Sequence, residues 1–264
     1  MRLWLRWRGW RESAAVRRRA IPDDLWKRTL VRHPFLRRRS EQDMAELRRL
    51  TSLFLDRKEF STAGGLRLTN MMAVTVAAQA VLPVLHLGLT RYDGFLGIVL
   101  HPDAVRAPRE QADEDGVVHA WDEPVAGEAM QGGPLMLSWR DVRAGGRPDG
   151  TFGQAYNVVI HEFAHVLDME DGVADGVPML PAELPATEWA AALQGAWQQF
   201  LHQPEHGVLD PYAAQGPDEF FAVASEAFFV TPQALRAQHP GLYGVFQRFY
   251  RQDPANEPGA DRAD

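Results

Sequence analysis

The five residues 161–165 read His-Glu-Phe-Ala-His and constrain this chain more than any other feature. On a helix, residues four apart lie on the same face, so His161 and His165 can present two imidazole nitrogens to one metal ion. Glu162 follows His161 by about 100° around the helix, where its carboxylate can accept a proton from water beside the metal. The pattern therefore predicts a zinc site with Glu162 as its general base.

The alternative is a pair of ordinary core histidines that are satisfied by hydrogen bonds. The neighbours of the motif are apolar nearly all round the expected helix: Val158, Val159, Ile160, Phe163, Ala164, Val166 and Leu167. Such a helix is buried, and buried His and Glu side chains need polar partners. A metal ion supplies a partner to both histidines at once, which favours the zinc site.

A catalytic zinc ion needs a third protein ligand and one open position. Glu219 and Glu226 are the best candidates, because they lie in a segment rich in phenylalanine that leaves little polar face. On a helix they share one face but lie roughly 10 Å apart along its axis, so only one can reach the metal. The other could orient a ligand histidine. The spacing alone leaves open which glutamate is the ligand.

Asp168 is a further candidate for orienting a histidine. It lies seven residues after His161, on the same face of the expected helix. Its carboxylate could accept a hydrogen bond from a ligand histidine, or it could face solvent at the end of the helix. Both interpretations stay open at this point.

Several segments together resemble the Mlc titration factor A (MtfA) family of bacterial zinc peptidases. The matching pieces are 127–129, 137–139, 157–169, 171–172, 174–176, 212–213, 219–222, 225–226, 239–240 and 242–243. The resemblance runs from about Pro22 to Pro254, nearly the whole chain. This joint pattern is far more specific than the His-Glu-x-x-His motif alone.

The resemblance implies a zinc metallopeptidase, with aminopeptidase action as one candidate form. It implies one zinc ion per chain, held by His161, His165 and Glu219, and so favours Glu219 over Glu226. It also implies that Glu162 is the general base and that Tyr212, seven residues before the ligand glutamate, is an active-site tyrosine. Tyr212 would then donate a hydrogen bond to the oxyanion; the alternative is a tyrosine of the core.

The resemblance also implies a regulatory role, because family members sequester the transcriptional repressor Mlc, which controls glucose-uptake genes. The expected partners are therefore a peptide or protein substrate and an Mlc-like repressor. The alternative function is a non-catalytic, repressor-sequestering protein in which the zinc site is secondary. No motif in the sequence itself indicates a repressor-binding surface.

Charge is unevenly placed along the chain. The net charge is −7, yet residues 1–40 carry twelve Arg and one Lys against three acidic residues, which leaves −17 for the rest. An acidic body argues against direct nucleic-acid binding. The absence of cysteine excludes disulfides and Cys-ligated zinc, and it fits a cytoplasmic protein.

Composition divides the chain into three parts. Residues 1–21 form a basic Arg/Trp-rich arm, which is either mobile or a weak contact for an anionic surface, a peripheral membrane contact or nucleic acid. The arm lacks the apolar stretch of a signal peptide. Residues 22–252 form a single catalytic domain, and 253–264 form a polar, disordered tail. The uncharged run 68–90 is interrupted by polar residues and predicts a core helix over 71–85, ended or kinked near Pro83, rather than a membrane span.

Periodicity predicts a mainly helical chain with few strands. Helices are expected to begin at Pro22 and after Ser40, and to cover 187–201 and 240–252. Apolar runs at 95–100, 117–119 and 135–139 predict strands, and the polar segment 103–115 predicts a surface loop. Segment 127–129 is either a segment on the substrate side of the site or a plain edge strand or turn. The expected fold is therefore α+β. The resemblance specifies a zincin-like (gluzincin-type) metallopeptidase domain, mainly helical, with a small β-sheet.

Overall fold

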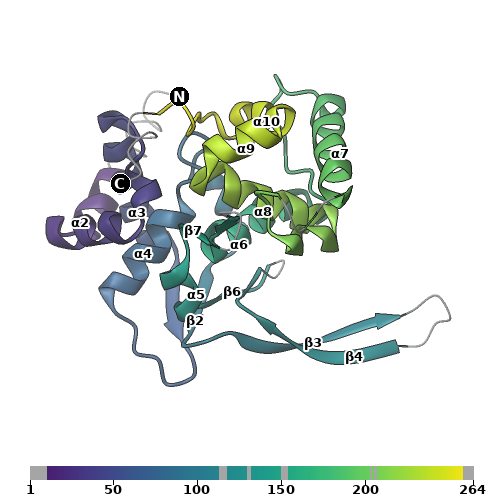
Figure 1. Cartoon of the computed structure of the whole chain (residues 1–264). Coiled ribbons are helices and arrows are strands. Elements are labelled where there is room, and N and C mark those ends of the chain that lie inside the picture. The colour runs from purple at the N-terminus through teal and green to yellow at the C-terminus, as the bar shows by residue number, and fades with distance from the viewer. Residues whose placement is uncertain are drawn as a thin grey trace.

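The computed structural model describes residues 11–112, 118–129, 132–149, 154–202, 204 and 207–257. These residues form a mostly helical body with one four-stranded sheet and two small hairpins, as Figure 1 shows. The expected α+β class is confirmed. The first ten residues of the expected arm and residues 258–264 of the expected tail lie outside the described residues.

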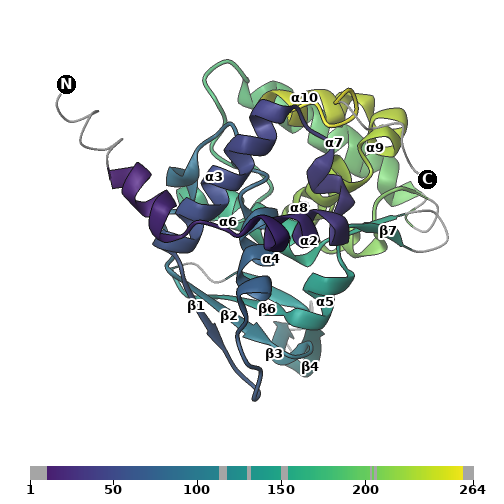
Figure 2. The ribbon, with the colours of Figure 1, turned by 90° about the vertical axis from the view of Figure 1, so that its left-hand side faces the viewer.

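Three helical segments form the N-terminal part, beside α4 (Asn70–Ala80) and above the sheet in Figure 2. They are the helical residues 11–18, α2 (Asp23–Arg32) and α3 (Glu41–Arg57), with the short η1 (Pro34–Arg37) between the last two. Ser40 caps α3 as expected, since its Oγ accepts a hydrogen bond of 3.1 Å from the backbone N–H of Asp43. Residues 11–21 pack on this layer through the buried Ala15 and Ile21.

The uncharged run 68–90 is a buried core segment, as predicted. Its helix α4 begins after Thr69, whose side chain accepts a hydrogen bond from Met72 N–H, and ends at Ala80. Pro83 cannot continue a helical hydrogen-bond ladder, and the chain passes it in turns whose side chains are also buried. None of the helices in the described ranges is long and apolar enough to cross a membrane.

The main sheet has the strand order β1-β2-β6-β5. Strands β1 (Glu59–Thr62), β2 (Gly97–His101) and β6 (Leu135–Ser138) are parallel, and β5 (Gly127–Ala129) pairs antiparallel with β6 at the edge. The strands expected near 95–100 and 135–139 are thereby confirmed. Trp139 instead begins α5 (Trp139–Ala144), because Ser138 caps a helix there.

The expectation of a surface loop at 103–115 is wrong for residues 105–112, and residues 113–115 lie outside the described part of the chain. Residues Val105–Ala112 form β3, which pairs antiparallel with β4 (Val118–Val125) in a hairpin that extends away from the body in Figure 1. The polar sequence lacks the apolar run on which the other strand predictions rest, and this strand is defined by its backbone pairing with β4. A second, short hairpin joins β7 (Arg147–Asp149) to β8 (Gln154–Tyr156), directly before the motif helix.

The C-terminal part consists of α6 (Val158–Asp168), η3 (Met169–Asp171), α7 (Ala186–His202), η5 (Pro211–Gln215), α8 (Pro217–Val230), α9 (Pro232–Gln238) and α10 (Pro240–Tyr250). The expected helices near 187–201 and 240–252 are confirmed. Trp189 of α7 stacks on Phe246 of α10, with ring centroids 5.4 Å apart, and both are buried. Phe221 of α8 packs edge-on against both rings, with centroids 5.8 and 5.6 Å away, so this aromatic cluster joins α8 to α7 and α10.

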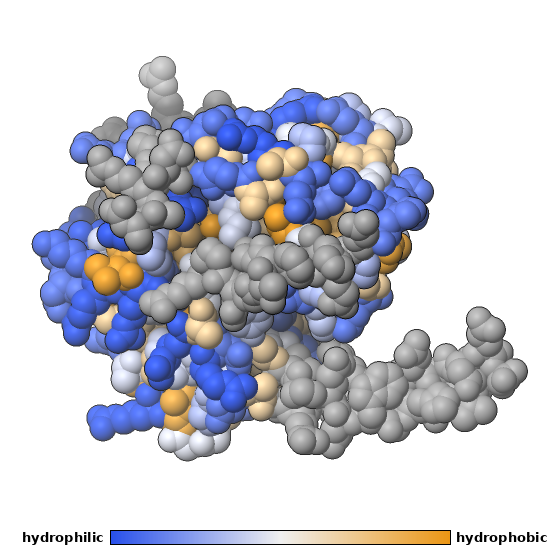
Figure 3. Space-filling view, in the orientation of Figure 1, coloured by the Kyte–Doolittle hydropathy of each residue, from blue (hydrophilic) through white to orange (hydrophobic). Residues whose placement is uncertain are grey.

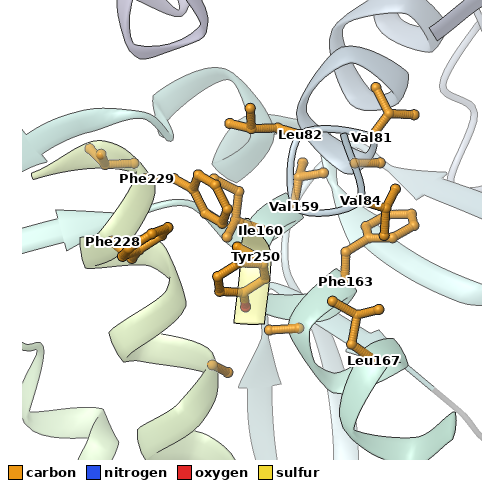
Figure 4. Close-up of a cluster of buried hydrophobic side chains, with 14 of the residues drawn as sticks. Val81, Leu82, Val84, Val159, Ile160, Phe163, Leu167, Phe228, Phe229 and Tyr250 are labelled. Atoms are coloured by element: carbon orange, nitrogen blue, oxygen red, sulfur yellow. The ribbon is translucent and has the colours of Figure 1, made fainter. Parts of the chain in front are cut away.

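Helix α6 lies at the centre of the core. In Figure 4 its apolar side chains lie between α8 and the segment after α4; the labelled members of this cluster are Val81, Leu82, Val84, Val159, Ile160, Phe163, Leu167, Phe228, Phe229 and Tyr250. The outer surface differs, since the described residues on the face in Figure 3 are mainly hydrophilic with small apolar patches. A central, tightly packed helix can hold side chains in fixed positions.

Candidate metal centre

Asn157 fixes the start of α6. Its Oδ1 accepts a hydrogen bond of 3.0 Å from the backbone N–H of Ile160, and its Nδ2 donates one of 2.8 Å to Gln79 Oε1 of α4. Both Asn157 and Gln79 are fully buried. The cap therefore sets where α6 begins and ties it to α4, so the rotation of the helix is fixed.

Three side-chain atoms from two helices converge at one point. His161 Nε2 lies 3.2 Å from His165 Nε2, and Glu219 Oε2 lies 3.0 Å from the first and 3.4 Å from the second nitrogen. Among the described residues this is the one group of three or more His, Asp or Glu side chains whose ligand atoms all lie within 4.8 Å of one another. Two imidazoles and a carboxylate are a typical donor set for zinc.

The burial and charge of Glu219 fit a cation between the three ligand atoms. Its Oε2 atom is buried and makes no hydrogen bond of good geometry in the described part of the chain. Burial alone would raise the pKa of Glu219, but its contacts with His161 and His165 outweigh burial and hold that pKa well below its usual range. Burial likewise lowers the pKa of His161, but Glu219 and Glu226 raise it well above its usual value. The cluster attracts a positive charge, which a metal ion would supply.

Glu226 contacts the opposite side of the His161 ring. His161 Nδ1 donates a hydrogen bond of 2.8 Å to Glu226 Oε1, and the backbone N–H of Asn157 donates to Glu226 Oε2. Glu226 is buried. A histidine that carries its proton on Nδ1 leaves Nε2 as an unprotonated ligand atom, so this contact sets the tautomer that metal binding needs.

Glu162 lies beside the cluster and next to strand β5. Its side chain is buried, and its carboxylate accepts a hydrogen bond from the backbone of Ala129. Burial raises the pKa of Glu162. A carboxylate with a raised pKa in a buried site is suited to exchange protons with a reacting group.

Tyr212 also lies beside the histidine cluster. It belongs to η5, which Asp210 caps by accepting a hydrogen bond of 2.9 Å from the backbone N–H of Tyr212. Its ring centroid lies 5.9 Å from that of His161. A hollow of about 240 Å³ opens here, and its lining includes Tyr156, Val158, Asp210, Tyr212 and Val223 together with His161 and Glu162. A larger hollow of about 490 Å³ lies toward the C-terminal end of α6 and contains none of the candidate ligands.

Asp168 is the one site candidate that lies apart from this group. Its Oδ2 accepts a hydrogen bond of 2.9 Å from the backbone N–H of Gly176, in the loop after α6, and its side chain is fully buried. No hydrogen bond joins it to His161 or His165 in the described part of the chain. It fixes the loop rather than a histidine ring.

Sequence reasoning missed three participants near the site. Gln79 and Asn157 hold the start of α6. Tyr156 lines the hollow, and its hydroxyl forms a hydrogen bond with Asp141. Burial raises the pKa of Tyr156 well above its usual value. A buried Gln in an otherwise apolar helix is a signal that could have pointed to Gln79, because such a side chain needs a polar partner. Tyr156 carries no such signal.

The sequence is similar to those of several known proteins. Residues 7–251 match the family described as "Glucose-regulated metallo-peptidase M90". The chain is 37% identical over 227 residues to Mlc titration factor A of Edwardsiella ictaluri, covering 84% of this chain and 85% of that protein. It is 34% identical over 235 residues to the protein of that name from Pectobacterium atrosepticum, covering 84% and 83%. An uncharacterised protein of Synechocystis is 34% identical over 253 residues, covering 94% and 90%.

Proposed function

Because the chain belongs to the family of glucose-regulated M90 metallo-peptidases, we propose that it hydrolyses peptide bonds at a single zinc ion. His161, His165 and Glu219 would hold the ion, within a zincin-like domain that covers 22–252. The observation that carries this proposal is the convergence of their three ligand atoms beside the buried carboxylate of Glu162. The bound zinc would polarise the scissile carbonyl and lower the pKa of an attacking water molecule.

Four parts of the protein have separate roles in the proposed reaction. Glu162 accepts the proton of the attacking water and delivers it to the leaving amine. Tyr212 donates a hydrogen bond to the developing oxyanion from the rim of the hollow. Glu226 keeps the His161 ring in the tautomer whose Nε2 faces the other ligand atoms. The edge strand β5 packs against α6 and offers an extended peptide a place to pair.

Metal content and peptide cleavage test this proposal together. The purified protein should contain about one zinc ion per chain, since one site has three protein ligands. Zinc-loaded protein should cleave members of a peptide library, and Glu162→Gln should keep the zinc while turnover falls by at least ~100-fold. Substrates with free and with blocked amino termini separate aminopeptidase from endopeptidase action. Failure to take up zinc on titration would contradict the proposed site.

Titration of a repressor is the second candidate function. It rests on the relatives named Mlc titration factor A in Edwardsiella and Pectobacterium. The Glu162→Gln variant distinguishes it from peptide hydrolysis. If that variant still relieves repression by an Mlc-like protein in cells, binding carries the regulatory role; if the effect is lost in a folded variant, hydrolysis carries it. A cytoplasmic location, which the cysteine-free sequence supports, would suit either function.

A further inference from the structure

Gly127, the first residue of strand β5, faces the candidate general base. It pairs with Leu137 of β6. Its φ is not among the positive values that seven other described glycines adopt, so its backbone conformation is one that alanine also accepts. The need for glycine at this position therefore does not come from the backbone.

Space is what this glycine provides. A Cβ atom placed on Gly127 would lie 2.5 Å from Glu162 Oε1, 2.6 Å from its Cγ and 2.7 Å from its Cδ. All three distances are too short for non-bonded atoms. The carboxyl group of Glu162 thus occupies the volume that any other residue at 127 would fill.

Glu162 has little room to move aside without leaving its position. Glu162 is 4% exposed, and the backbone of Ala129, two residues along β5 from Gly127, donates a hydrogen bond to its carboxylate. Its helix α6 is fixed by the Asn157 cap and by the surrounding core. A side chain at 127 would therefore turn the carboxylate away from Ala129 and from the histidine cluster.

We infer that Gly127 is a positioning residue, whose missing side chain makes room for the carboxylate of Glu162 beside the metal cluster. The claim that Gly127 affects catalysis rests on the proposed peptidase function, in which Glu162 is the base. The claim that Gly127 makes room for the Glu162 carboxylate rests on the Gly127–Glu162 contact alone.

The activity test compares two glycines of the same sheet. Gly97 begins the neighbouring strand β2, and a Cβ there would meet Pro134 at an ordinary 3.5 Å. Gly127→Ala should keep wild-type zinc affinity while kcat falls by about 100-fold, the scale expected for a misplacement near 1 Å. Gly97→Ala should keep wild-type kcat. In the Glu162→Gln background, Gly127→Ala should cause no further loss, because the base is already absent.

The stability test needs no enzymatic activity. Gly127→Ala should lower the melting temperature of the metal-free protein by about 2–4 °C, the shift expected for modest overpacking in a domain of this size. In the Glu162→Ala background the added methyl group meets an emptied space, so the same substitution should leave the melting temperature unchanged. An equal change in the two backgrounds would show that the methyl group does not act through Glu162.

The outcomes separate the inference from the proposed function. Wild-type kcat in zinc-loaded Gly127→Ala, or an equal change of melting temperature in both backgrounds, overturns the positioning role. If zinc-loaded wild-type protein cleaves no peptide, the peptidase proposal fails, and the stability cycle alone decides whether Gly127 makes room for Glu162. Activity loss with retained zinc, together with a melting shift that vanishes in Glu162→Ala, supports the whole inference.

Discussion

Helices α6 and α8 both carry the candidate site, but they carry it in different ways. In α6 the two histidines are four residues apart, so they share a face within about one turn and their joint role can be read from spacing. In α8 the two glutamates are seven residues apart, and they contact opposite sides of one ring: Glu219 lies near His161 Nε2 and Glu226 near Nδ1. Local spacing identifies a candidate metal-binding helix, whereas the roles of the two glutamates on its partner helix depend on how the two helices pack.

Removal of a ligand should have the largest effect, and it should be the same for both helices. His161→Ala or His165→Ala in α6 and Glu219→Ala in α8 each leave two ligands, so each variant should purify without zinc and be inactive. Competition with a chromogenic chelator measures the affinity, and circular dichroism confirms folding. If Glu226→Ala loses zinc while Glu219→Ala retains it, the assignment of the two glutamates is reversed.

Tyr212→Phe should have the next largest effect and should leave the metal in place. Loss of the hydroxyl removes one donor to the oxyanion, so kcat should fall by about 100-fold while KM changes little. Steady-state kinetics on a peptide that the wild-type protein cleaves checks this result. If Tyr212→Phe keeps full activity, Tyr212 does not stabilise the oxyanion. The proposed catalytic residues would then all lie on α6 and α8.

Glu226→Gln should have a smaller effect, which separates the two glutamates of α8. The amide keeps the shape but is uncharged and has one acceptor oxygen in place of two, so it cannot accept from both His161 Nδ1–H and the Asn157 N–H as Glu226 does. Zinc affinity should therefore fall by about 10–100-fold without being abolished. The matched comparison is Glu219→Gln under the same chelator competition. Equal losses of zinc affinity in Glu226→Gln and Glu219→Gln would mean that the two glutamates of α8 do not have separate roles as ligand and as orienting partner.

Asp168→Asn should have the smallest effect on the site, because this carboxylate holds the loop at Gly176. Zinc affinity should stay within about 2-fold of wild type, whereas an orienting partner of a ligand histidine would cost at least about 10-fold. A loss of that size would restore the role that the sequence suggested for Asp168.

The same variant should differ from wild type in its stability as a function of pH. Burial raises the pKa of Asp168 from 3.8 to about 6, so the folded protein binds this proton more tightly than the unfolded chain does. The Asp168 contribution to the free energy of unfolding should therefore fall as pH rises between 3.8 and about 6, and Asp168→Asn should lack it. Urea unfolding at several pH values measures the difference.

The same contrast explains what could be predicted from the sequence. The family was predictable because its matching segments recur along nearly the whole chain. The helices with clear apolar stripes, and with them the α+β class, were predictable because each stripe depends on residues close together in the chain. The strand β3 was not, since Val105–Ala112 has a polar sequence and is defined by its pairing with β4. The Gln79–Asn157 hydrogen bond and the space at Gly127 were also hidden, because they exist only when distant segments meet.

Asn157 has a consequence for how the protein acquires its metal. Its side chain bonds Gln79, which is 78 positions earlier, and its backbone N–H bonds Glu226, which is 69 positions later. Closing such long loops costs conformational entropy, and the packing of the completed core offsets that cost. The ligand geometry is therefore a late product of folding, and a nascent chain cannot complete it before α8 has left the ribosome. Zinc uptake should follow folding rather than guide it, so the metal would enter a preformed site.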